Sequence, residues 1–205
     1  MSKKQTYARI APFYDFLDAS FEHKRYMPIR EEMWQGVEGK ILDAGVGTGR
    51  NMPYYPKGTA DQVIGIDLCP QMLARAEARK TDVGTEVDLF EMNVMATDYL
   101  DNHFDNVVAT FLFCVLEDED QCPALRELQR ITKPDGEIRI LEYAISEDPW
   151  RRFVQKLWAP WVSFAYGARF DRDTEQYLGD TCLELVERRF VYEDMIKLLI
   201  LKPNK

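Results

Sequence analysis

The segment from Ile41 to Asn51 constrains the fold of this chain more than any other part of the sequence. It reads ILDAGVGTGRN, an apolar strand that ends on an acid and continues into three glycines at alternate positions. A glycine-rich turn after a strand lets doubly wound α/β proteins bring their backbone close to a nucleotide-like ligand. The pattern here is G-x-G-x-G, whereas the turn that binds a dinucleotide pyrophosphate places its third glycine one residue later. The spacing therefore favours a cofactor that has no pyrophosphate.

A second acid ends the next apolar run, and its distance from the glycine turn is that expected for the end of the following strand. The run Val63–Asp67 ends 22 residues after Gly45. A carboxylate at this strand end accepts hydrogen bonds from the hydroxyl groups of a ribose in nucleotide-binding sheets. The glycine turn alone also fits a purely structural role in any doubly wound protein. The acid at this spacing is what favours a nucleoside site.

Composition and charge exclude several classes of protein. Of the 205 residues, 46% are apolar and 30% are charged, which predicts one α/β domain over residues 1–205. The net charge of −9 argues against nucleic acid as a partner, because phosphate binding needs clustered Lys and Arg. The four cysteines lack C-x-x-C spacing, so we expect reduced thiols and no metal. Without a signal peptide or an apolar run of spanning length, we expect a cytoplasmic location.

Apolar periodicity predicts seven strands with helices between them. The predicted strands span residues 40–43, 62–67, 86–93, 107–111, 137–143, 183–189 and 196–202. The predicted helices span residues 71–80 and 122–132, and the second ends in a turn at 133–136. The acidic run 117–120 is interpreted as the charge-complemented start of this second helix. Residues 1–36 are interpreted as a helical lid, and residues 147–180 as an insert between the fifth and sixth strands.

Two segments are basic in an otherwise acidic chain. Residues 1–30 carry six Lys and Arg against three acids, net +3, so the remainder is −12. Residues 150–172 carry five basic residues against one acid, with three of the four tryptophans of the chain. Trp beside Lys and Arg is typical of segments that lie on a membrane surface. The alternatives are aromatic rings that cover an edge of the sheet, and base stacking, which the total charge disfavours.

The glycine and acid motifs, residues 42–51 and 64–73, resemble motifs one and two of the class I S-adenosylmethionine-dependent methyltransferases. The resemblance implies a Rossmann-like seven-stranded sheet of strand order 3-2-1-4-5-7-6 with the last strand antiparallel. It also implies S-adenosylmethionine as the cofactor and S-adenosylhomocysteine as the product. Ligands of such sheets lie at the carboxyl ends of the strands, so the site is expected there.

A longer set of motifs resembles the soluble, peripheral bacterial phosphatidylethanolamine N-methyltransferases. The motifs are YARIAPFYD at residues 7–15, FEHKRY at 21–26, ATFLFC at 109–114, TEQY at 174–177, and YGAxFDR within the insert. The motif IAPxYD also occurs in ubiquinone and menaquinone C-methyltransferases, so it does not identify the substrate. The resemblance implies methylation of the phosphatidylethanolamine amine by a peripheral enzyme of the inner leaflet.

In this interpretation residues 1–30 and 150–172 contact an anionic membrane surface and the substrate is a phospholipid. Two other functions remain open. One is a methyltransferase for a quinone, a thiol or another small amphiphile, which predicts activity without lipid vesicles. The other is a non-catalytic S-adenosylmethionine-binding module, which predicts cofactor binding with no methylated product.

The resemblance and the strand ends together nominate the residues that bind the cofactor. Asp67 would hold the ribose, Tyr14 would close over the cofactor, and the three glycines would let its methionine part approach the backbone. At Asn93 relatives often have an acid, so this position departs from the family pattern. The predicted cofactor-binding residues are Tyr14, Gly45, Gly47, Thr48, Gly49, Asn51, Asp67, Leu68, Met72, Asn93, Val94 and Thr110.

The chemistry of the methyl acceptor indicates a second set of candidate residues, which would bind the substrate or accept its proton. An ethanolamine nitrogen is mostly protonated at neutral pH, so it must lose a proton before it can attack the methyl group. Arg30 or Arg169 suits the lipid phosphate, because a guanidinium binds phosphate through two parallel hydrogen bonds. For each of these residues a packing or surface role remains open. The candidate proton acceptors, left unranked, are Tyr26, Glu142, Tyr143 and Tyr177.

Overall fold

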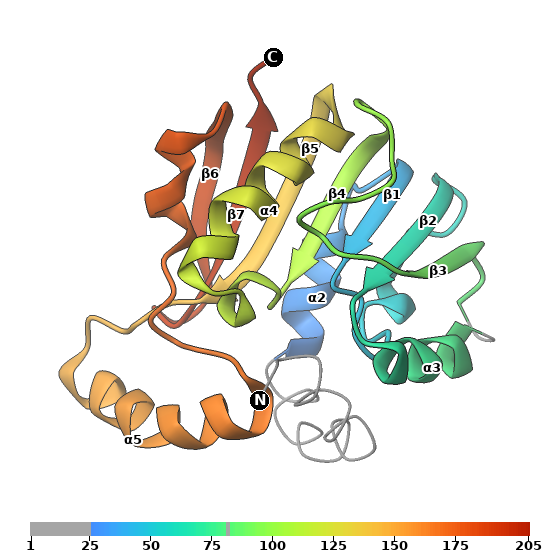
Figure 1. The fold of residues 1–205 in the computed structure, drawn as a ribbon. Helices are drawn as coiled ribbons and strands as arrows, with labels where there is room; N and C mark the ends of the chain where they lie inside the picture. Colours follow the sequence, from blue (N-terminus) through green and yellow to red (C-terminus); the bar gives the residue numbers. More distant parts are fainter. Residues whose placement is uncertain (1–25, 81–82) are drawn as a thin grey trace.

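A computed structural model describes residues 26–80 and 83–205 (Figure 1). A seven-stranded sheet of order β3-β2-β1-β4-β5-β7-β6 forms its centre, with β7 antiparallel to both β5 and β6 and the other neighbours parallel. The predicted fold and strand order are confirmed. The strands are β1 Gly39–Ala44, β2 Ala60–Asp67, β3 Val87–Glu91, β4 Phe104–Thr110, β5 Thr132–Tyr143, β6 Leu183–Tyr192 and β7 Ile196–Pro203.

Helices cover both faces of the sheet because alternate strand residues point to opposite sides. On one face of the sheet, Leu42 of β1 shares a hydrophobic cluster with Leu125 and Leu128 of α4. On the other face, Ile41 of β1 shares a second cluster with Met33 of α2. The α4 helix lies in front of the sheet in Figure 1, and α2 lies behind it. The helices are α2 Met27–Trp34, α3 Pro70–Arg79, α4 Asp118–Ile131 and α5 Pro149–Tyr166, with 3-10 turns η2 Met52–Tyr54, η4 Phe113–Val115 and η5 Thr174–Asp180.

The structure corrects two boundaries near α4. This helix begins at Asp118, four residues before the predicted boundary, and the acidic run interpreted as its start does supply its first turn. The predicted turn at residues 133–136 is wrong, since these residues belong to β5, where the register with β4 is irregular between Thr132 and Glu137. Gly136 is required there because a Cβ would lie 2.5 Å from the carbonyl oxygen of Asp105.

The predicted lid is described from residue 26 onward, where α2 begins beside Pro28 in its first turn. Tyr14 and the rest of residues 1–25 lie outside the described residues. The α5 helix forms the first part of the predicted insert and stands away from the sheet in Figure 1. Within the described ranges, no helix combines the length and apolar character needed to span a membrane.

Candidate functional site

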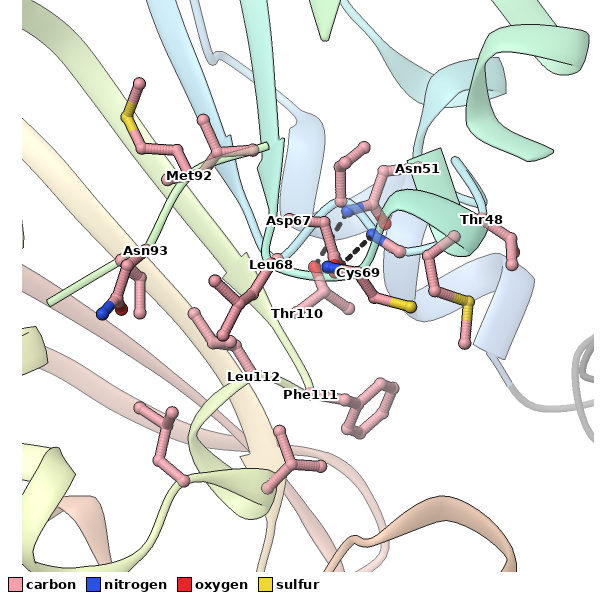
Figure 2. A pocket seen from close by; sticks show the side chains of 18 of the residues that line it. Thr48, Asn51, Asp67, Leu68, Cys69, Met92, Asn93, Thr110, Phe111 and Leu112 are labelled. Carbon is pink, nitrogen blue, oxygen red and sulfur yellow. Dashed lines mark hydrogen bonds between the residues drawn. The ribbon is translucent and has the colours of Figure 1, made fainter. Parts of the chain in front are cut away.

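Two adjoining cavities lie at the carboxyl ends of the parallel strands. The first, of about 530 Å³, is bounded by the loops after β1, β2, β3 and β4, and Figure 2 shows side chains from these loops around it. The second, of about 570 Å³, lies between α5, the end of β5 and the turn between β6 and β7. Only Arg30, Phe111 and Val115 line both cavities among the residues described. The two cavities therefore meet at these three side chains.

The three glycines after β1 have different roles, although all have positive φ. A Cβ on Gly45 would lie 2.9 Å from Leu112, and one on Gly49 would lie 2.9 Å from Met52. A Cβ on Gly47 would meet no atom closer than 3.9 Å, and this residue lines the first cavity. Gly49 does not line that cavity, so its requirement for glycine comes from packing and from its positive φ. The cradle for a ligand is at Gly47.

Asp67 connects the glycine turn to the beginning of α3. Its Oδ2 accepts a hydrogen bond from the backbone N–H of Gly47 at 3.0 Å, and its Oδ1 accepts one from that of Cys69 at 2.8 Å. Burial raises the pKa of Asp67, and these backbone donors oppose the rise. Each carboxylate oxygen can accept more than one hydrogen bond, so Asp67 can also accept ribose hydroxyls in the cavity that it lines (Figure 2).

A buried polar network lies beneath the first cavity. The Nδ2 of Asn51 donates to both oxygens of Asp43, at 3.1 and 2.9 Å, and to the Oγ1 of Thr110 at 3.2 Å. Arg30 donates to the Oδ1 of Asn51 at 2.6 Å, and the hydroxyl of Tyr55 donates to Asp43 at 2.7 Å. Burial raises the pKa of Asp43 to about 6. Asn51 is thus the centre of a network that orders the turn from below.

Most of the predicted cofactor-binding residues surround one cavity. Thr48 also accepts a hydrogen bond from Arg79 at 2.8 Å, and Asn93 accepts one from the backbone of Met95 at 3.0 Å. The predicted residues that line the first cavity are Gly45, Gly47, Thr48, Asn51, Asp67, Leu68, Met72, Asn93, Val94 and Thr110. Sequence reasoning missed several lining residues in the segments after β3 and β4, namely Met92, Met95, Val115, Leu116, Glu117 and Asp120.

An aromatic cluster lines the second cavity next to the junction. The hydroxyls of Tyr26 and Tyr143, 117 positions apart in the chain, lie 3.0 Å from each other. The ring of Phe111 stacks on Tyr143 with 4.7 Å between centroids, and Phe170 meets Tyr143 edge-on at 5.1 Å. The guanidinium of Arg30 lies 5.9 Å from the centroid of Phe111. Two of the four predicted proton acceptors are therefore brought together here.

The other two predicted proton acceptors line neither cavity. Glu142 is fully buried, with Lys197 at 3.3 Å and a hydrogen bond from Thr174 at 2.5 Å. It points away from the site because consecutive residues of β5, Glu142 and Tyr143, face opposite sides of the sheet. The hydroxyl of Tyr177 lies 3.2 Å from Asp118. Of the four unranked candidates, only Tyr26 and Tyr143 therefore line the second cavity.

The two arginines predicted for the lipid phosphate are also separated. Arg30 lines both cavities and is buried, whereas Arg169 lines neither. Arg169 makes two hydrogen bonds to Asp171, at 2.8 and 2.7 Å. The fork of its guanidinium is directed at this neighbouring carboxylate. The site geometry thus favours Arg30 over Arg169 as a ligand contact.

Asp43 and Glu142 should make the free energy of unfolding depend on pH. Burial raises the pKa of Asp43 from 3.8 to about 6 and that of Glu142 from 4.5 to about 7. Folding therefore favours the protonated carboxyls, a contribution that is complete below pH of about 4 and lost as the pH rises through 6 and 7. We expect the free energy of unfolding to increase on the order of 2 kcal/mol from pH 7.5 to pH 5.

Urea unfolding of the wild type, Glu142→Gln and Glu127→Gln at both pH values checks this dependence. Glu142→Gln should reduce the difference between the two pH values. Glu127→Gln should leave it unchanged, because Arg130 and Thr97 lower the pKa of Glu127 to about 2, outside this range. A wild type that is less stable at pH 5 than at pH 7.5 would contradict the expectation.

Comparison with known proteins places this geometry among methyltransferases. Residues 41–136 match a family model described as a methyltransferase domain. The chain is 32% identical over 152 residues to the phosphatidylethanolamine N-methyltransferase of Cereibacter sphaeroides, covering 73% of this chain and 72% of that protein. It is 30% identical over 142 residues to the ubiquinone/menaquinone biosynthesis C-methyltransferase UbiE of Shewanella frigidimarina. That match covers 67% of this chain but only 56% of the relative.

Two solved structures extend the likeness of fold beyond these relatives. The DhpI–SAH complex superposes with a TM-score of 0.70 at 15% identity, over 98% of this chain and 95% of that one. A SAM-dependent methyltransferase from Aquifex aeolicus superposes with a TM-score of 0.62 at 18% identity, over 87% of this chain and 89% of that one. At these identities the comparison concerns the fold alone.

Proposed function

Because this chain belongs to the class I S-adenosylmethionine-dependent methyltransferases, we propose that it transfers the methyl group to the amine of phosphatidylethanolamine, as the first step toward phosphatidylcholine. In this proposal residues 1–205 act as one methyltransferase domain at the cytoplasmic face of a membrane. The observation that carries the proposal is the second cavity. It is lined mostly by aromatic and apolar side chains, adjoins the first cavity, and is bordered by the exposed apolar surface of α5.

The residues that line the first cavity suit the chemistry of the cofactor. The open space above Gly47 accepts a ligand where a side chain would stand, and Asp67 provides the carboxylate for the ribose. Leu68, Met72 and Val94 supply apolar surface for the adenine. When bound, S-adenosylmethionine supplies an electrophilic methyl group on a sulfonium, so the task of the protein is alignment and the exclusion of water.

The acceptor amine must reach that methyl group where the two cavities meet. There the guanidinium of Arg30 and the loss of water both disfavour a protonated amine and lower its pKa. Tyr143 accepts the proton while passing its own to Tyr26, which releases it to water, so the pair relays one proton without a net change. Because the proton leaves to solvent, neither tyrosine keeps a charge, and the lowered pKa of the amine reduces the cost of its deprotonation.

The surface of α5 is proposed to hold the enzyme on the membrane. Five large apolar side chains recur at spacings of three and four residues, which places them along one side of the helix. Each of them is between 49% and 71% exposed. The basic residues Arg152 and Lys156 are exposed on the same helix, and cations near anionic lipid contribute about 1 kcal/mol each. The apolar stripe consists of Trp150, Phe153, Leu157, Trp161 and Phe164.

Replacing Leu157 and Phe164 with serine should weaken binding to anionic vesicles by roughly tenfold or more, because burying each side chain contributes about 1.5–3 kcal/mol at most. These two residues line neither cavity, so the affinity for S-adenosylhomocysteine should not change. Vesicle co-sedimentation at several salt concentrations measures the effect. Binding should fall as salt rises, since salt screens exposed cations.

The matched control is Leu185→Ser with Val186→Ser. These side chains are exposed on β6, away from α5 (Figure 1). The control should bind vesicles like the wild type. Equal vesicle binding by the Leu157→Ser, Phe164→Ser variant and by this control would contradict the proposal that α5 contacts the membrane.

Incubation with labelled S-adenosylmethionine and a total lipid extract, resolved by headgroup and by quinone fraction, tests the substrate. We expect label in methylated phosphatidylethanolamine and none with Asp67→Ala. Label in the quinone fraction would favour the second candidate, which the similarity to the Shewanella frigidimarina protein supports. Cofactor binding with no labelled product in any fraction would favour a non-catalytic binding module.

A further inference from the structure

Phe111 has a backbone conformation that a bulky residue rarely adopts. Its φ is +53° at the end of β4, and it is the one aromatic residue with positive φ in the described part of the chain. The left-handed region costs a residue with a Cβ about 1–2 kcal/mol. A strained residue persists where its surroundings determine it, and such residues gather at functional sites.

Contacts on several sides hold this conformation. The N–H of Phe111 donates to the carbonyl oxygen of Leu141 at 2.8 Å, which anchors the backbone to β5. Its ring stacks on Tyr143 and meets Tyr26 at 5.2 Å between centroids. The guanidinium of Arg30 lies over the ring. With these neighbours around it, the ring acts as a wall and leaves little open face for a ligand cation.

The position of this wall coincides with the passage between the cavities. Phe111 lines both cavities, and so does the apolar residue Val115, four positions later in the chain. The next residue, Leu112, lines only the first cavity, beside Gly45. The unusual turn at Phe111 therefore places a large ring where the acceptor must meet the methyl group.

We propose that Phe111, with Val115 at the same junction, is a specificity-determining residue that limits how many methyl groups the acceptor nitrogen can carry when it enters the junction. This inference rests on the proposed function, because it takes the acceptor to be an amine. Primary and monomethylated amines pass, and the bulk of each added methyl group works against a further transfer. One methyl group at a tight apolar contact changes selectivity by about tenfold or more.

The test compares kcat/KM for phosphatidylethanolamine and for its monomethyl and dimethyl derivatives in mixed micelles. Phe111→Leu widens the junction and should raise the ratio of dimethyl to unmethylated turnover by about tenfold. Val115→Phe narrows it and should lower the same ratio. Changes of this ratio in opposite directions in the two variants would indicate a limit on acceptor size, because a general loss of folding or activity would not produce them.

Two further variants distinguish the effect of the Phe111 ring from effects of its backbone conformation and of lost stability. Phe111→Gly adopts positive φ without strain, so it should fold and should shift the ratio as Phe111→Leu does. Phe113→Leu alters a fully buried ring two residues away and should leave the ratio unchanged. The affinity for S-adenosylhomocysteine, measured by calorimetry, should stay within about twofold of wild type in Phe113→Leu, because Phe113 lines neither cavity.

The outcomes distinguish this inference from the proposed function. A wild type that methylates none of the three lipids overturns the proposed function, and this inference with it. An active wild type whose ratio is unchanged in Phe111→Leu, Phe111→Gly and Val115→Phe overturns this inference alone. A ratio that Phe113→Leu shifts as strongly as Phe111→Leu also overturns it.

Discussion

Gly47→Val is expected to abolish cofactor binding while the protein stays folded. A Cβ at this position would meet no protein atom closer than 3.9 Å, and the residue lines the first cavity, so we expect the side chain to project into that cavity. Valine would occupy the space proposed for the methionine part of the cofactor, and we expect affinity to fall by about 100-fold or more, on the order of 3 kcal/mol. Calorimetry with S-adenosylhomocysteine, with circular dichroism to check the fold, measures this.

The positive φ of Gly47, +56°, requires a control for backbone strain. Gly58 has a φ of +82° and lies outside both cavities, and a Cβ on it would meet no atom within 4 Å. Gly58→Val therefore carries comparable strain, about 1–2 kcal/mol, without filling the cavity. It should bind S-adenosylhomocysteine normally. Equal affinity in both variants and the wild type would mean that the turn is only structural.

Asp67→Ala is expected to weaken cofactor binding by about 100-fold, because a lost hydrogen bond and an unpaired buried group cost about 1–3 kcal/mol each. The substitution removes the acceptor proposed for the ribose. It also leaves the N–H groups of Gly47 and Cys69 without their observed partner, so the glycine turn is less ordered. Titration of S-adenosylhomocysteine into the variant measures the loss.

Asp88→Ala is the matched control for this substitution. Asp88 lies on the neighbouring strand β3, accepts a hydrogen bond from Gln62 at 2.6 Å, and lines neither cavity. It should bind S-adenosylhomocysteine like the wild type. If Asp67→Ala binds S-adenosylhomocysteine as tightly as the wild type does, Asp67 does not bind the ribose and another residue must do so.

The strands and the glycine turn were predictable from the sequence because their signals are local, whereas the strand order came from the family resemblance. The glycine turn and the acid at Asp67 lie at the ends of two apolar runs, and parallel strands bring such ends to one edge of a sheet. Residues chosen from those ends, including Leu68, Asn93 and Thr110, therefore line the same cavity. The turn predicted at 133–136 failed because Pro, Asp and Gly indicate a change of direction equally in a turn and in an irregular strand.

The acceptor side of the site was decided by tertiary structure. Tyr26 and Tyr143 meet although 117 positions separate them, and no periodicity in either segment encodes that contact. Glu142 was an equal candidate in the sequence, but the alternation of β5 directs it toward Lys197 while Tyr143 lines the second cavity.

The sequence by itself determined the sheet, the glycine cradle and the acid beside it, because hydrophobic spacing and backbone freedom are properties of neighbouring residues. Only the tertiary structure decided that Gly49 serves packing, that Arg30 binds Asn51, and that Phe111 stands between two cavities. Those outcomes depend on which side chains distant segments bring within contact distance. Distance in space, unlike spacing along the chain, exists only once the sheet and its helices have packed.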